Sequence, residues 1–179
     1  VIASGDATGS TAAEFNTINS ATTVAIDASE VTALASSNLS DVKTLLTAAN
    51  DTDQFTDSTG KVSFGGLTAV AIADATVDVS DFNDAVTQAN TATGKTTAAN
   101  GGGATVFTLS NATAFNGGTA ADFATLITNE GKSLISGGIT TQALTVDSGT
   151  IAVSAANDLN TTTTGVVTAT ITEGDMSTL

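Results

Sequence analysis

The chain has 179 residues, of which 41% are apolar, and this suffices for one ordinary domain or two small ones. Its formal net charge of −14 disfavours nucleic acid and anionic lipid as partners, and no apolar stretch approaches the roughly 18 residues of a membrane span. His and Cys are absent, so the commonest general base, thiolate nucleophile and transition-metal ligands are missing, and we expect a protein that is not an enzyme.

Predicted helix starts recur along the chain where a small or polar residue, an acid and an apolar residue occur close together. Ser or Thr caps the exposed amides, the acid complements the helix dipole, and a second apolar residue three or four positions later extends a buried stripe. The first apolar residues of the predicted helices are, in chain order, Phe15, Val31, Val42, Phe82, Phe123, Leu159 and Met176.

Short β-branched or alternating runs precede most of these helix starts and predict strands. They cover residues 24–26, 62–64, 70–72, 104–109, 144–146 and 166–171. A strand followed within a few residues by a short helix is typical of α/β proteins with a largely parallel sheet. We therefore predict a solenoid-like α/β body with short helices packed on the sheet, with a β-rich sandwich carrying short helices as the alternative.

Two segments are similar to each other and indicate an internal repeat. Residues 69–83 and 143–160 each contain an alternating run, a turn, a second run and a helix start. Aromatic residues are only 4% of the chain, all of them Phe, so the core should be thin and depend on regular stacking. We predict a single repeat-built domain over residues 1–179, in which the Gly-rich stretch 91–103 is a loop or the boundary between two halves.

One stretch, Ala89 to Thr96, matches a relaxed phosphate-binding loop and ends in Gly94-Lys95-Thr96. The motif requires a strand before the loop and a helix after it, so that backbone amides surround the phosphate. Here the predicted helix comes first and Ala replaces the leading Gly, so we do not predict a nucleotide site.

Three carboxylates, Asp51, Asp53 and Asp57, precede the glycine turn at Gly60. Calcium takes several hard oxygen ligands at alternating loop positions, and this loop approximates that arrangement without the closing Glu of the helix–loop–helix motif. The three residues are candidate calcium ligands, and the alternative is a solvated acidic turn. Asp74, Asp78, Asp81 and Asp84 are predicted to serve as turn and cap residues rather than as a catalytic carboxylate pair.

The segments Ala155 to Ile171 and Ile26 to Leu34 resemble Ala/Thr-rich repeats of very large surface or secreted, adhesin-like proteins of cyanobacteria and other marine bacteria. The similarity is strongest over about the last 40 residues. It implies an extracellular or cell-surface location and a structural or adhesive role, and it transfers no functional residue. The chain begins at Val1 rather than Met, so we expect a processed product or a segment of a longer protein.

We therefore predict an extracellular structural protein: a subunit of a filament or surface layer, or a segment of a large adhesin. Its partners would be copies of itself or the rest of a longer chain, joined through strand edges and repeat ends. Val1 to Ala3 and Val166 to Ile171 are the candidate edges. The alternatives are a calcium-dependent carbohydrate- or surface-binding module and a phage fibre or decoration protein.

Overall fold

The computed structural model describes residues 9–28, 31–50, 55–56, 66–91 and 104–172. The described helices are α1 (Ala12–Ala21), α2 (Leu39–Ala49), α3 (Val79–Thr91), α4 (Ala120–Gly131) and α5 (Val153–Thr162). The described strands are β1 (Ile26–Asp27), β2 (Ala33–Ser37), β3 (Phe55–Thr56), β4 (Ala69–Ile72), β5 (Thr76–Asp78), β6 (Val106–Thr108), β7 (Ala114–Gly118), β8 (Ile135–Ser136), β9 (Ala143–Ile151) and β10 (Val167–Ile171). The predicted α/β class is confirmed.

Strand pairing is parallel at every pair in the described part of the chain, as the sequence predicts. One four-stranded sheet has the order β2-β4-β6-β8 and the other has the order β5-β7-β9-β10, while β1 and β3 form a separate pair. Each four-stranded sheet thus adds its strands in chain order. The chain advances in one direction, and each pass lies beside the previous one.

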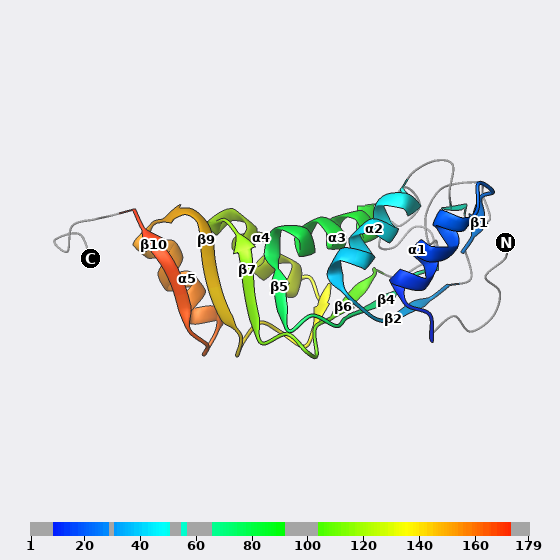
Figure 1. The fold of residues 1–179 in the computed structure, drawn as a ribbon. Helices are drawn as coiled ribbons and strands as arrows, with labels where there is room; N and C mark the ends of the chain where they lie inside the picture. Colours follow the sequence, from blue (N-terminus) through cyan, green and yellow to red (C-terminus); the bar gives the residue numbers. More distant parts are fainter. Residues whose placement is uncertain (1–8, 29–30, 51–54, 57–65, 92–103, 173–179) are drawn as a thin grey trace.

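The molecule is elongated, with α1 and β1 at one end and β10 at the other (Figure 1). Successive helices contact each other from α1 to α5, and α3, α4 and α5 pack on β7, β9 and β10 respectively. The strands run across the long axis, so the hydrogen bonds between them point along it.

The core lies between the helices and the sheets and is continuous along the described part of the chain. Phe82, Phe107, Phe115 and Phe123 are fully buried. The ring of Phe82 on α3 meets that of Phe107 on β6 edge to face, with centroids 5.5 Å apart. These four Phe side chains lie in the middle of the body, where large side chains bury the most area. A core with few aromatic residues can therefore be well filled.

Two helix starts have the predicted cap chemistry in full. The Thr11 hydroxyl accepts from the Glu14 amide and the Glu14 carboxylate accepts from the Thr11 amide, so that both orphan donors are satisfied. Thr119 and Asp122 form the same reciprocal pair at α4. The hydrogen bonds from Thr11 lower the pKa of the Glu14 carboxyl, as expected for a carboxylate that accepts from a backbone amide.

Threonine hydroxyls join successive passes of the chain. The buried Thr105 donates its hydroxyl to the Leu67 carbonyl at 2.7 Å, and the buried Thr163 donates to the Gln142 carbonyl at 2.7 Å. Further bonds of this kind form at the surface, where Thr68, Thr113 and Thr164 donate to backbone carbonyls of the preceding pass. At these three surface positions the same carbonyl also accepts from a backbone amide, so the threonine hydroxyl adds a second hydrogen bond between neighbouring passes.

Thr105→Val should lower the free energy of unfolding by about 1–2 kcal/mol, because a buried carbonyl loses its hydroxyl donor while the side-chain volume is kept. The measurement is urea denaturation followed by circular dichroism. Thr113→Val is the matched control, since its hydroxyl bond lies at the surface where water replaces it, and we expect a change within about 0.5 kcal/mol. Equal losses in both variants would contradict the prediction.

Some sequence expectations need correction. The helix predicted at Val31 is wrong, because the following residues 33–37 form strand β2, where Leu34 is buried against the core. The similar segments 69–83 and 143–160 are not equivalent, because β4 and β9 lie in different sheets. Ile151 ends β9 and Val153 already begins α5, so the second predicted run there is not a separate strand.

Other predicted elements fare as follows. Strands form at 70–72, within 104–109, at 144–146 and at 167–171, and helices form around Phe15, Val42, Phe82, Phe123 and Leu159. The run 24–26 contributes only Ile26 to β1. The strand predicted at 62–64, the helix at Met176 and residues 92–103 of the predicted boundary lie outside the described residues.

Candidate functional site

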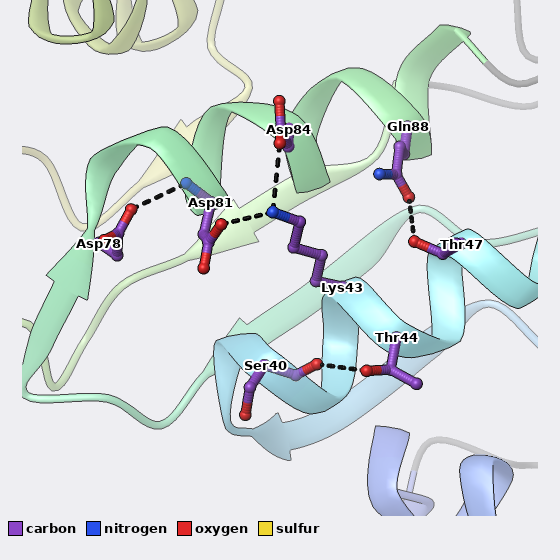
Figure 2. A network of polar contacts seen from close by, with 8 residues as sticks. All are labelled: Ser40, Lys43, Thr44, Thr47, Asp78, Asp81, Asp84 and Gln88. Atoms are coloured by element: carbon purple, nitrogen blue, oxygen red, sulfur yellow. Dashed lines mark hydrogen bonds and ion pairs between the residues drawn. The ribbon is translucent and has the colours of Figure 1, made fainter. Parts of the chain in front are cut away.

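The ion pairs in the described part of the chain join α2 to α3. Lys43 of α2 extends its ammonium group between two carboxylates of α3, forming an ion pair with Asp81 and another with Asp84 at 3.2 Å (Figure 2). Asp81 and Asp84 lie three residues apart, so both carboxylates project from the same face of α3. One turn further along, the Thr47 hydroxyl meets the Gln88 side-chain oxygen at 3.3 Å.

Local hydrogen bonds fix both sides of this contact. The Asp78 carboxylate accepts from the Asp81 amide at 2.9 Å and thereby caps the first turn of α3. On α2 the Thr44 hydroxyl donates to the Ser40 carbonyl at 2.9 Å. A shallow, open surface depression lies here, lined by Ser40, Lys43, Thr44, Thr47 and Asp81.

The Lys43 ammonium group is held in place by two carboxylates and acts as a positively charged partner for them. The hydrogen bond to Asp81 is the largest cause that raises the pKa of Lys43, and Asp84 adds to the effect. An ammonium group that stays protonated has no lone pair with which to act as nucleophile or base. The arrangement is therefore suited to holding α2 against α3.

The aspartates predicted as turn and cap residues divide into two groups. Asp78 caps α3 as predicted, and Asp74 accepts from the Leu39 amide at 2.7 Å and so caps α2 from the following pass of the chain. For Asp81 and Asp84 the described role is different, because both pair with Lys43. The sequence did not predict this pairing. The acids at i and i+3 are a signal for a cation, but a single sequence does not indicate that the cation is Lys43, 38 residues away.

The candidate calcium ligands Asp51, Asp53 and Asp57 lie outside the described residues, as do Lys95 and Thr96 of the stretch compared with a phosphate loop. Within the described ranges, no group of three or more acidic, His or Cys side chains is placed to hold a metal ion. The calcium site stays a prediction.

The end of the body at β10 presents a second feature of functional interest. β10 is hydrogen-bonded to β9 on one side and is the last strand of its sheet in the described structure. Val166, directly before it, has 71% of its surface exposed. The other candidate edge, Val1 to Ala3, lies outside the described residues.

Lys43→Met should lower the free energy of unfolding at neutral pH by only about 0.5 kcal/mol, since the partners are exposed and the ion pair is screened by solvent. A raised lysine pKa stabilises the folded state below the ordinary value of 10.5, and the stabilisation is lost as the pH rises through the raised pKa. The difference between wild type and variant should therefore shrink as the pH rises above 10.5. Urea denaturation at neutral and alkaline pH tests this.

Lys132→Met is the matched control, because it removes the same charge at the exposed end of α4, where the described residues include no ion-pair partner. A pH-dependent difference of equal size in both variants would assign the effect to net charge rather than to the α2–α3 contact.

None of the described helices combines the length and apolar character needed to cross a membrane. Comparisons of the chain with protein-family models, with curated proteins and with solved structures found no match.

Proposed function

We propose that the chain is a non-enzymatic structural protein that self-associates through the ends of its elongated body, as a subunit of a filament or surface layer or as a segment of a large adhesin. The observation that carries the proposal is the position of the exposed apolar side chains. In the described part of the chain the exposed large hydrophobic residues are Ile18, Val24 and Val166. Ile18 and Val24 belong to the α1–β1 end and Val166 belongs to the β10 end.

Apolar groups confined to the ends favour association end to end. Single exposed apolar residues are common on protein surfaces, but they are normally scattered. Here the long sides of the described body expose polar residues such as Thr44, Thr125 and Thr128, while the ends expose Val and Ile. Contacts between ends extend the body lengthwise, and this is the geometry that a fibre or layer requires.

The proposal includes a repeat-built, solenoid-like architecture over the whole chain. Strands added in chain order, parallel pairing and a row of helices in contact support it. The extracellular or cell-surface location is also proposed, and it is supported by the resemblance of Ala155 to Ile171 to repeats of bacterial surface proteins.

The experiment is sedimentation velocity and negative-stain electron microscopy of the wild type and of Val166→Lys, with and without a calcium chelator. We expect the wild type to associate and Val166→Lys to weaken the association by about tenfold or more, because a lysine at a strand edge opposes pairing. Thr125→Lys, on the exposed face of α4, carries the same charge change and should associate like the wild type.

Ionic strength provides a second readout. Copies that each carry a net charge of −14 repel one another, so added salt should strengthen the association by screening. Assembly that dissolves in chelator would instead indicate that calcium holds the copies together, with Asp51, Asp53 and Asp57 as its candidate ligands. A wild type that stays monomeric at all salt concentrations would contradict the proposal.

A further inference from the structure

In the described part of the chain, the apolar side chains of β10 are less buried than those of β9. Val167, Ala169 and Ile171 are half-buried, whereas their register partners on β9, the residues Leu144, Val146 and Ile151, are buried, with at most 4% of their surface exposed. The inward-facing side of the last strand is therefore as apolar as that of the strand before it, but among the described residues no strand lies on its outer side. An additional strand beside β10 would complete the burial.

The edge of β10 also lacks the devices that keep strand edges from pairing. Natural sheets protect exposed edges with Lys, Pro, bulges that twist the edge away or very short strands. Residues 166–171 contain no charge and no Pro, and five of the six are β-branched Val, Thr or Ile. The register irregularity at this pair lies on the β9 side, where residues 147–150 are skipped between Val146 and Ile151. β10 itself thus offers an almost regular edge.

The sequence of this edge is nearly symmetric about Ala169. In an antiparallel pair of two β10 strands centred on Ala169, Val167 meets Ile171 of the second copy and Thr168 meets Thr170 of the second copy. Such β-branched and Thr–Thr cross-strand pairs stabilise sheets, and no like charges oppose each other. The apolar residues 167, 169 and 171 of both copies then fall on the same face, above the α5 helices.

The other edge of this sheet is a poorer partner. β5 has three residues, one of which is Asp78, whose carboxylate already caps α3. α1 and α2 lie beyond β5 toward the opposite end of the body (Figure 1). A head-to-tail contact would therefore bring β10 against the α1–β1 end of the body rather than against β5.

We infer that two copies of the chain join through β10 in antiparallel orientation across a two-fold axis at Ala169, so that the β5-β7-β9-β10 sheet continues from one copy into the other. The inference rests on the proposed self-association and specifies its first contact. It makes the β10 contact a closed, isologous one, so that any growth into a filament requires a second contact at the α1–β1 end.

The test uses single cysteines in a chain that has none of its own. Thr168→Cys and Thr170→Cys are prepared separately, since both positions are exposed and tolerate the change. The two-fold pairing places residue 168 of one copy opposite residue 170 of the other, within disulfide reach, whereas two copies of the same variant hold their thiols a diagonal of about 7–8 Å apart. Mild oxidation of the equimolar mixture should give a disulfide-linked dimer that either variant alone forms at least about fivefold less.

A mixture of Thr125→Cys and Thr128→Cys on α4 is the matched control and should remain uncrosslinked. Association in sedimentation without preferential crosslinking of the 168 and 170 mixture would overturn the two-fold contact and leave the proposed function standing. Equal crosslinking in each single variant would also overturn the register about Ala169. Monomers in every condition would overturn both proposals.

Discussion

Replacing Gly165 with alanine is expected to lower the free energy of unfolding by about 3 kcal/mol and to abolish self-association in the same variant. A Cβ at this position would lie 2.2 Å from the Gln142 carbonyl oxygen and 2.9 Å from the Ala143 nitrogen. These are backbone atoms, so no side-chain rotation relieves the overlap, and the chain entering β10 must move away from β9.

A shift of the chain at the start of β10 would break two hydrogen bonds. The Gly165 amide donates to the Thr163 hydroxyl at 2.9 Å, and the Leu144 amide donates to the Val166 carbonyl at 2.8 Å. Without them, the pairing of β10 with β9 loses its first backbone hydrogen bond. Since β10 is also the proposed contact between copies, the loss of stability and the loss of association should appear together.

Gly131→Ala is the matched control for this prediction. Among the described residues, no heavy atom outside its own helix lies within 4 Å of a Cβ built at Gly131, so the variant should be as stable as the wild type or slightly more stable. Urea denaturation and sedimentation velocity are measured on both variants. A Gly165→Ala chain with wild-type stability would show that β10 does not pack on residues 142–143 as described.

Phe107→Ala is expected to lower the free energy of unfolding by about 3–5 kcal/mol. Phe107 is fully buried on β6, pairs with β4 and β8 on either side, and contacts the ring of Phe82. Truncation removes a large apolar area in the middle of the body and leaves a cavity that neighbours on two strands and a helix close only in part. Such a loss is a large share of the roughly 5–15 kcal/mol that stabilises a typical domain.

The comparison variants for Phe107 separate burial from ring contact. Val166→Ala at the exposed end should change stability by less than about 0.5 kcal/mol, because its side chain is already in water. A double-mutant cycle with Phe82→Leu and Phe107→Leu should give a coupling of about 0.5–1.5 kcal/mol for the edge-to-face pair. A loss below 1 kcal/mol for Phe107→Ala would contradict the described core.

The helices were the part of the fold that the sequence predicted best. Thr11 with Glu14 and Thr119 with Asp122 carry cap chemistry within four residues, so local sequence is sufficient to recognise them. The helix predicted at Val31 failed because Ser29-Glu30-Val31 has the same local pattern, and only the pairing of residues 33–37 with β4 makes a strand there. Strands of two residues, such as β3 and β8, are too short for an alternating pattern to be recognised.

The functional features also divide into those encoded in local sequence and those that depend on tertiary packing. The edge at Val166 to Ile171 was predicted because a run of β-branched residues without charge is visible in the sequence itself. The contact of Lys43 with Asp81 was not predicted, since it depends on how α2 packs on α3, and no local pattern encodes that packing.

The direction of the strands has a mechanical consequence for the proposed structural role, in which load would act between the ends of the body. Tension along the long axis acts on the hydrogen bonds between neighbouring strands and not along the covalent chain, since the strands cross that axis. Under a rising pull the end passes should peel away first while the interior stays folded. The pairing of Ala33 with Ala69 indicates that one released pass supplies about 36 residues, or about 120 Å of extended chain. Such stepwise lengthening would dissipate force before any covalent bond is strained.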